Sequence, residues 1–384
     1  MKAQKQLLFS SWLAFDPPVW AVLDKLAKEY AFSVTVLAPA KVYVGQIYSP
    51  PTGYLTPDLV DQSIADVRII ALLDDDNPAL GFKPDMLRSA LSDLDPDAIW
   101  IHCEPIDGLT RQLLKHFYFR RKTRIACFLA ENLWQRPQLP QRIKAQILSL
   151  RIDALLAVGS TSSQSAYRAF IPKRVRSHTV FMPNFDPRSS DLGDLYIPRK
   201  SGDFWVGFVG KLSWEKGWHV LIEALSLLPD QVKAIIAGTG PDASKLQETI
   251  RSCHLTERVV VAGVKSRPDL NALYKQVDAV VVPSLTTPKW TEQFGRVIAE
   301  AMAAGRPVIG TRSGAIPEVI GDAGILVDEA DPIALSGALQ RLIQDGALKD
   351  RLGRAARLRF EQEFSIDTFA RRLHQILNGT YSLV

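Results

Sequence analysis

The sequence has few of the features that define several common classes of protein. Its 384 residues include only three cysteines, Cys103, Cys127 and Cys253, whose spacing matches neither a disulfide framework nor a zinc cluster. No apolar run reaches the roughly 18 residues that a membrane-spanning helix needs, and the six histidines lack the spacing of metal ligands. We therefore expect a cytoplasmic protein, in a reducing compartment, with no disulfide, bound metal or membrane-spanning helix.

A strong excess of charge is absent as well. The net charge of +5 suits an anionic substrate or an anionic membrane surface, but it is too weak to argue for nucleic acid. Hydrophobic residues make up 47% of the chain and charged residues 23%, which is typical of a folded globular protein. The length suits two domains of ordinary size.

The N-terminus resembles a short signal peptide without completing one. Lys2 and Lys5 precede or border the apolar run LLFSSWLAF, but the run then meets Asp16-Pro17-Pro18 with no small-residue cleavage pattern. We expect this segment to be the first buried strand of the fold.

Short apolar runs alternate with helical stretches along the chain, which is typical of parallel sheets covered by helices on both faces. In the first half the pattern predicts strands at 32–39, 67–73, 97–103, 124–130, 153–160 and 179–185, with helices at 19–30 and 109–119. In the second half it predicts strands at 204–210, 233–238, 259–264, 279–284 and 324–328, with helices at 218–228, 243–253, 269–277, 334–344 and 364–379. The segment 183–203 is rich in Pro, Asp, Ser and Gly and is the best candidate for a domain boundary.

The stretch 291–310, TEQFGRVIAEAMAAGRPVIG, carries the main functional signal. Its middle has apolar residues at helical spacing, Gly305 ends the helix, and a buried strand follows. Glu292 and Gly295 precede the helix, whose free N–H groups and dipole can receive a phosphate. Glu300 lies inside the helix, where its carboxylate can accept hydrogen bonds from sugar hydroxyls. The alternative is an ordinary amphipathic helix with two solvated glutamates.

A second feature is the loop GKLSWEKG at 210–217, which follows a predicted strand. Gly210 and the cations Lys211 and Lys216 would lie at the carboxyl end of that strand. Ligands of parallel sheets bind at this edge, so two lysines there suit a diphosphate. The alternative is a solvated charged loop.

A third feature is the glycine turn AGTGPD at 237–242. With Gly238 and Gly240 it satisfies a dinucleotide-binding pattern, GTGPDA, and Glu257 lies at a plausible distance. The turn follows the second strand of its domain and not the first, so contact with a nucleotide's base or ribose is the better interpretation. An NAD-dependent oxidoreductase that uses GTGPDA is the alternative.

Four motifs follow one another in a fixed order: GKLSWEKG, AGTGP, the Pro283-Ser284 turn and EQFGRVIAEAMAAGRPVIGTRSGAIPEVI. This ordered set resembles family 4 of the retaining glycosyltransferases, in the glycosyl transferases group 1. The matching region is roughly 204–345. The resemblance implies an α/β GT-B fold, with two Rossmann-like parallel-sheet domains facing across a cleft. It implies an acceptor-binding domain at 1–190, a nucleotide-sugar-binding domain at 200–364, and a C-terminal helix at 365–384 that crosses back to the first domain.

The resemblance also assigns roles to individual residues. Glu292 and Glu300 match the family's E-x7-E pair, which implies that Glu300 holds the donor's ribose and that Glu292 faces its sugar and phosphates. Lys211 and Lys216 match the basic pair that neutralises the diphosphate, although the family more often has Arg at the first position. The implied donor-binding residues are Gly210, Lys211, Lys216, Gly238, Gly240, Val264, Glu292, Phe294, Gly295, Arg296 and Glu300.

The chemistry of transfer agrees with this assignment. Breaking a sugar–phosphate bond places negative charge on the leaving diphosphate, which two lysines and a helix N-terminus stabilise. We nominate no covalent nucleophile, since retention without one is usual in the family, and we expect no metal. Asp74-Asp75-Asp76 is comparable to a metal-binding DxD motif, but we interpret it as an acidic turn.

The first half resembles the family only in pattern. The candidate catalytic residues are Glu292, Lys211, Lys216 and His102, which lies at the end of a predicted strand. The alternative for His102 is a histidine satisfied by packing. Glu131-Asn132 stands where many members have a sugar-facing histidine, and FSSWLAFDPP replaces the usual glycine pair.

The acceptor is the least determined part of the prediction. Six cations and three aromatics within 111–124 could rest on an anionic membrane and receive a lipid-linked acceptor, or form a solvated helix end. Tyr43, Tyr48 and Tyr54 could stack on a sugar or only pack their loop. The sequence thus predicts transfer of a hexose from a UDP-, GDP-, ADP- or TDP-sugar to a glycan, lipid-linked or small-molecule acceptor. A catalytically silent GT-B partner protein is a further alternative, which the four intact site residues argue against.

Overall fold

The computed structural model describes residues 4–11, 13–43, 54–75, 77–130, 139–169, 171–181 and 193–381. Tyr48, Asp76, Glu131-Asn132 and residues 183–192 of the predicted boundary lie outside these residues. The chain forms two compact units. Unit 1 comprises Met1–Gly45, Gly53–Pro183 and Ile366–Val384, and unit 2 comprises Gln46–Thr52 and Asn184–Ser365. The assignment of acceptor binding to 1–190 and of nucleotide-sugar binding to 200–364 stays a prediction.

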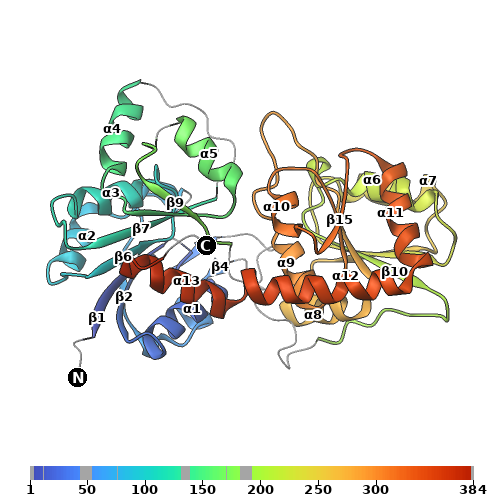
Figure 1. Cartoon of the computed structure of the whole chain (residues 1–384), viewed down its shortest axis with the longest axis horizontal. Helices are drawn as coiled ribbons and strands as arrows, with labels where there is room; N and C mark the ends of the chain where they lie inside the picture. Colours follow the sequence, from blue (N-terminus) through green and yellow to red (C-terminus); the bar gives the residue numbers. More distant parts are fainter. Residues whose placement is uncertain are drawn as a thin grey trace. The chain divides into compact units, whose positions relative to one another are not determined.

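Unit 1 is built on a seven-stranded parallel sheet in the order β5-β2-β1-β6-β7-β8-β9 (Figure 1). Its strands are β1 Lys5–Ser10, β2 Phe32–Ala38, β5 Ala65–Ile69, β6 Ala98–Ile101, β7 Arg124–Leu129, β8 Ala154–Ala157 and β9 Arg176–Thr179, and a short antiparallel pair is formed by β3 Val42–Tyr43 and β4 Tyr54–Leu55. Its helices are α1 Pro17–Lys28, α2 Pro84–Leu91, α3 Gly108–His116, α4 Leu139–Ser149 and α5 Ser160–Ala169. The central strands read AIWI and ALLA and are fully buried, because helices cover both faces of a parallel sheet.

The C-terminal helix α13, Ile366–Asn378, belongs to unit 1, where it packs against α1, β6 and β7. The Phe369 ring lies 5.7 Å from the Trp100 ring, and the Arg124 guanidinium donates to the Ile376 carbonyl at 2.7 Å. The preceding segment, α12 at Gly346–Arg359 and a π-helical turn at Phe360–Phe364, belongs to unit 2. The predicted return of the tail helix to the first unit is therefore confirmed.

Unit 2 is built on a six-stranded parallel sheet in the order β12-β11-β10-β13-β14-β15. Its strands are β10 Phe204–Val209, β11 Val232–Ala237, β12 Val259–Gly263, β13 Ala279–Val282, β14 Val308–Thr311 and β15 Gly324–Val327. The strand order reverses between β10 and β13. The loops that follow these two strands therefore meet at the topological switch point, where ligands bind in open parallel sheets.

Helices cover both faces of this sheet. They are α6 Trp218–Ser226, α7 Ala243–Ser252, α8 Arg267–Gln276, α9 Arg296–Ala303, α10 Ile316–Ile320 and α11 Pro332–Gln344. Helices α6, α7 and α11 share one apolar core with the sheet, and α8 and α9 contact β10, β13 and β14. Both units thus have the Rossmann-like architecture that the sequence predicted.

Two points of the local prediction need correction. The strand predicted at 179–185 lies earlier, at Arg176–Thr179, and helices α2, α4, α5, α10 and α12 were not predicted. In α12, the sequence GALKDRLGRAARLR buries only Leu352, Gly353 and Ala356, so it shows little apolar periodicity. No helix in the described part of the chain is long and apolar enough to cross a membrane.

Candidate functional site

At the switch point of unit 2, the loop after β10 meets the loop after β13. The Lys216 ammonium donates to Glu292 Oε2 at 2.8 Å, and the Ser284 hydroxyl donates to the same oxygen at 2.8 Å. Glu292 is only 7% exposed. Gly217 has a φ of 70°, and a Cβ there would lie 1.8 Å from the Pro283 carbonyl oxygen. Only glycine allows this approach of the two loops, which holds Lys216 against Glu292.

An aromatic ring completes the surroundings of Lys216. The ammonium lies 4.5 Å from the centroid of the Trp290 ring, within reach of a cation–π interaction. A tight turn presents this ring, with the Thr287 N–H donating to the Trp290 carbonyl at 2.7 Å. Trp290 was not predicted to belong to the site, although an aromatic residue two positions before Glu292 was a usable signal.

The backbone of Glu292 is fixed from the neighbouring strands. Gly314 has a φ of 52°, and a Cβ there would lie 2.1 Å from the Glu292 carbonyl oxygen, which also accepts from the Ala315 N–H at 3.0 Å. Earlier in the same loop, the Thr286 hydroxyl donates to Glu329 Oε1 at 2.7 Å. These contacts leave the Glu292 carboxylate little freedom to move.

Helix α9 begins directly after this loop. Gly295 is its N-cap residue with a φ of 75°, and no side chain caps the helix. Such a helix N-terminus presents the positive end of the helix dipole. The buried Phe294 ring packs against Phe364, with 5.9 Å between the ring centroids.

Glu300 is a buried carboxylate on α9, 6% exposed. Arg267 Nη1 donates to its Oε1 at 2.7 Å, and the Tyr274 hydroxyl donates to its Oε2 at 2.7 Å. Burial alone would raise the pKa of Glu300. The positive charges of Arg267 and Arg296, with the two hydrogen bonds, more than offset burial, so its pKa is lowered. Glu300 is therefore an ionised acceptor at neutral pH.

The remaining predicted donor-binding residues lie at the same carboxyl edge of the sheet. The Lys211 side chain is exposed and makes no ion pair with another described residue. A Cβ at Gly210 would meet nothing within 4 Å, so the surface beside its backbone is open. Val264 is exposed in the loop after β12.

The glycines of GTGPDA have a structural role. A Cβ at Gly238, whose φ is 145°, would lie 1.8 Å from the Gly210 carbonyl oxygen. A Cβ at Gly240 would lie 2.3 Å from the Leu212 carbonyl oxygen. The Leu212 N–H in turn donates to the Thr239 carbonyl at 2.9 Å. These glycines let the β10 and β11 loops touch, which accounts for the pattern without a dinucleotide.

His102 lies in unit 1, after β6, and is 4% exposed. Its ring centroid lies 4.3 Å from that of Phe128 and 5.5 Å from that of Trp100, and its Nδ1 lies 3.5 Å from the Ser11 hydroxyl oxygen. Its catalytic role stays a prediction, and this aromatic packing favours the structural alternative. Among the described residues, no group of three or more His, Cys, Asp or Glu side chains is placed to hold a metal.

Sequence comparison with known proteins finds similarity mainly in the part of the chain that forms unit 2. Residues 197–359 match the family model of the glycosyl transferases group 1. The D-inositol 3-phosphate glycosyltransferase of Arthrobacter sp. (strain FB24) is 34% identical over 189 residues, which cover 47% of this chain and 43% of that protein. An uncharacterized glycosyltransferase of Methanocaldococcus jannaschii is 31% identical over 168 residues, 43% of this chain and 42% of that protein. The chain thus spans less than half the length of these relatives.

Solved structures cover the whole chain. The Anabaena protein Alr3699/HepE in complex with UDP has a TM-score of 0.73 at 19% identity, covering 98% of this chain and 100% of that one. A glycosyltransferase from Rickettsia africae has a TM-score of 0.74 at 16% identity, covering 98% and 99%. At these identities the likeness shows the fold, and the predicted GT-B fold is confirmed. Residues 197–359 of this chain are thus similar to the glycosyl transferases group 1.

Proposed function

We propose that the protein is a glycosyltransferase that moves a hexose from a nucleoside diphosphate sugar to an acceptor hydroxyl. The observation that carries the proposal is the Lys216–Glu292 pair, 2.8 Å apart at the switch point. Glu292 lies in the loop that leads into the N-terminus of α9, and both residues lie inside the segment that matches the family model. Cations and a helix N-terminus converging on one edge of a sheet suit a diphosphate.

Lys211 and Lys216 neutralise the diphosphate in this proposal. The exposed Lys211 is available to a phosphate, while Glu292 and Trp290 hold Lys216 in place before a ligand arrives. As the sugar–phosphate bond breaks, charge grows on the leaving diphosphate, and preorganised cations stabilise it at little reorganisation cost. We propose a metal-independent reaction for this reason.

Glu300 holds the ribose of the donor. An ionised carboxylate accepts up to about four hydrogen bonds, and Arg267 and Tyr274 supply one each. Both oxygens therefore retain acceptor capacity for the two ribose hydroxyls. The lowered pKa of Glu300 keeps it in the acceptor form that hydroxyl donors require.

Uridine diphosphate hexoses are the first donors to test, because the Anabaena structures contain UDP, and UDP with glucose. GDP-, ADP- and TDP-sugars are the other candidates. We propose retention of the anomeric configuration without a covalent intermediate, on the family resemblance alone. The cytoplasmic location predicted above is also part of this proposal.

The experiment measures nucleoside diphosphate release from the four sugar nucleotides, with and without EDTA, and the anomeric configuration of the product by NMR. We expect one donor to be turned over equally with and without the chelator, giving a retained product. Lys216→Ala should abolish most turnover, while Lys245→Ala, an exposed lysine on α7, should not. Oxidation or reduction of NAD with no sugar transfer would support the oxidoreductase instead. Nucleotide binding without turnover would support the silent partner.

A groove in unit 1 is the observation that supports the proposal of a lipid-linked acceptor at an anionic membrane. A cavity of about 620 Å³ lies between α3 and α4, with Arg111, Lys115 and Lys144 as the charged residues of its wall. Ile143 and Ile147, also in the wall, are 48% and 50% exposed. An apolar stripe flanked by cations suits the surface of a bilayer that contains anionic lipid.

Vesicle flotation tests this surface. Vesicles with phosphatidylglycerol should carry the wild-type protein, and Ile143→Gln with Ile147→Gln should remain in solution. Vesicles of neutral lipid should bind neither. Equal flotation of the double variant would remove the support that this groove gives to a lipid-linked acceptor.

A further inference from the structure

A second cavity lies in unit 2, at the opposite edge of the sheet from Lys216 and Glu292. Its volume is about 300 Å³. Asp278 and Pro307, which line it, immediately precede β13 and β14, so it opens at the amino ends of these strands. Its charged lining consists of Arg306, Lys349, Arg354, Arg357, Asp278 and Asp350.

The lining carries a net positive charge. Four cations against two carboxylates give +2. Asp278 is already shared, since it pairs with Arg199, accepts from the Trp205 N–H at 2.8 Å and lies 3.4 Å from the Lys349 ammonium. Arg357 pairs with Glu361, which lies outside the lining, at 2.8 Å, so Arg306 and Arg354 are the cations with little carboxylate left to neutralise them.

Arg306 is the least compensated of these cations. Its Nη2 donates to the Lys275 carbonyl at 2.7 Å, but its buried Nε has no hydrogen-bond partner among the described residues. Burial lowers the pKa of Arg306, while Asp278 opposes this effect and Arg199 reinforces it. A buried N–H without an acceptor is costly, so an acceptor that reaches the Nε of this half-buried side chain would be favourable.

The cavity owes its shape to the approach of α12 to the end of α9. A Cβ at Gly353 would lie 2.6 Å from the Gly305 carbonyl oxygen, so glycine is needed at this contact. Arg357 Nη1 donates to the Ala303 carbonyl at 2.7 Å, and its Nε to Glu361 at 2.8 Å. Arg357 thus covers a terminal carbonyl of α9 that would otherwise repel an anion.

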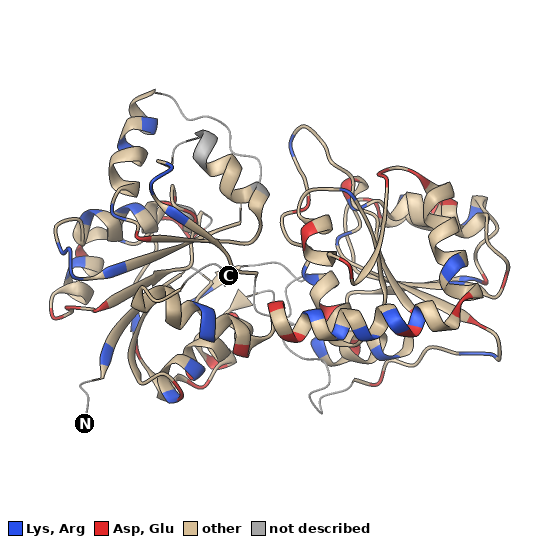
Figure 2. Cartoon of the chain, in the orientation of Figure 1, with Lys and Arg blue, Asp and Glu red and all other residues tan. Residues whose placement is uncertain are grey.

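We propose that this cavity binds a phosphate group, either as the free anion or as part of a phosphorylated small molecule. Guanidinium groups and an ammonium donate strong charge-assisted hydrogen bonds to phosphate oxygens, and α12 presents a row of such cations along its length (Figure 2). The site is separate from the donor site of the proposed function. It lies where α9, the helix that carries Glu300, comes to its C-terminal end.

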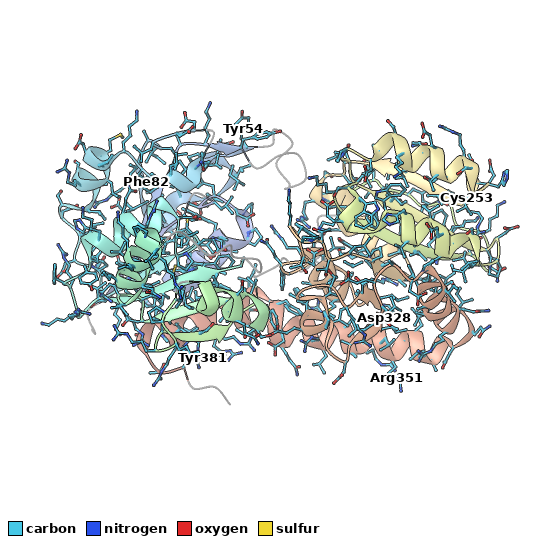
Figure 3. All side chains as sticks on the ribbon, turned by 90° about the horizontal axis from the view of Figure 1, so that it is seen from above. Tyr54, Phe82, Cys253, Asp328, Arg351 and Tyr381 are labelled. Carbon is cyan, nitrogen blue, oxygen red and sulfur yellow. The ribbon has the colours of Figure 1, made fainter. Side chains whose placement is uncertain are left out.

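The test measures the dissociation constants of inorganic phosphate and of glycerol 3-phosphate by thermal shift, at constant ionic strength. The key variant is Arg354→Gln, because Arg354 is exposed and its loss should not disturb folding. The matched control is Arg351→Gln, an exposed arginine on the same helix that does not line the cavity (Figure 3). A double variant, Lys211→Ala with Lys216→Ala, removes phosphate binding at the donor site.

We expect Arg354→Gln to weaken phosphate binding about tenfold, as for the loss of one charge-assisted hydrogen bond. Arg351→Gln should bind phosphate as the wild type does, and the double lysine variant should keep the binding at this cavity while losing only what the donor site contributes. Tighter binding of glycerol 3-phosphate would identify an esterified phosphate as the ligand, and tighter binding of inorganic phosphate the free anion. Unchanged binding in Arg354→Gln would overturn the proposal. Loss of all phosphate binding in the double lysine variant would also overturn the proposal, because it would show that phosphate binds at the donor site and not at this cavity.

Discussion

The carboxyl edges of the two sheets are built differently. In unit 2, the carboxylates Glu292 and Glu300 are buried and held by Lys216 and Arg267. In unit 1, the corresponding position after a central strand is taken by His102, whose ring packs among aromatic side chains. A donor with two phosphates and a ribose presents the same groups in every reaction, so fixed charges can be built to meet it. An acceptor has no such constant groups.

Phe369→Ala should have the largest effect, because it should destabilise unit 1 and leave the stability of unit 2 unchanged. Phe369→Ala removes the α13 ring that lies 5.7 Å from Trp100, and the cavity left should cost unit 1 about 3–5 kcal/mol. Hydrogen exchange should speed up at the amides of β6 and β7 but not at those of β10 and β13. Arg371→Ala, an exposed change on the same helix, is the control. Equal loosening of both sheets would contradict the assignment of α13 to unit 1 alone.

The next prediction compares the effects on kcat of substitutions at the carboxyl edges of the two sheets, Lys216 in unit 2 and His102 in unit 1. Lys216→Ala should lower kcat by about 10² to 10³, as for the loss of one preorganised group that stabilises developing charge. His102→Phe keeps an aromatic ring in its cluster and should lower kcat less than about tenfold. Steady-state kinetics with the identified donor measures both. A loss in His102→Phe as large as that in Lys216→Ala would give the first unit a catalytic residue and end the contrast.

A smaller effect concerns the glycine turn of unit 2. Gly238→Ala forces a Cβ against the Gly210 carbonyl at a φ of 145° and should cost about 2–3 kcal/mol of stability. Gly337→Ala, in α11 with nothing within 4 Å of its Cβ, should instead stabilise by up to about 1 kcal/mol. Urea unfolding followed by tryptophan fluorescence measures the two changes. If the Gly238→Ala protein had normal stability but no longer bound nucleotide, the turn would have a ligand-binding role and not only a structural one.

The smallest effect is a pH dependence at Glu300. Its pKa is lowered in the folded protein from an ordinary value of 4.5. Its charge therefore adds stability that is fully present above pH 4.5 and is lost as the pH falls through the folded-state pKa; lowering the pKa by one corresponds to about 1.4 kcal/mol. Comparing wild type with Glu300→Gln by urea unfolding should show a stability difference that is largest near pH 7 and shrinks below pH 4.5. A difference that grew towards low pH would mean that the pKa is raised.

The fold was largely predictable because apolar strands alternate with helices throughout. β10 and β11 were predicted to within one residue, since each is a buried run that ends at a glycine. β9 was misplaced because its sequence, RSHT, is polar, which an edge strand paired only with β8 tolerates. The unpredicted helices are mainly those, such as α12, with few buried residues.

The site was predictable only where its residues form a local motif. Glu292 and Glu300 stand eight residues apart, and the resemblance nominated both; their roles stay a prediction. Arg267 and Tyr274, which hold the Glu300 carboxylate, lie 33 and 26 residues away from it in sequence. No spacing rule connects them, because α8 and α9 bring them together only in the folded sheet.

In the proposed function, unit 2 binds a sugar nucleotide through Glu300. A thermal-shift titration with UDP-, GDP-, ADP- and TDP-sugars and with NAD, on wild type, Glu300→Gln and the exposed control Glu248→Gln, tests it most directly. A ligand at about 100 times its dissociation constant adds about 2.7 kcal/mol of stability. We predict that one sugar nucleotide stabilises the wild type and Glu248→Gln, and that its effect is weaker in Glu300→Gln. A response to NAD alone, equal in all three proteins, would contradict the claim.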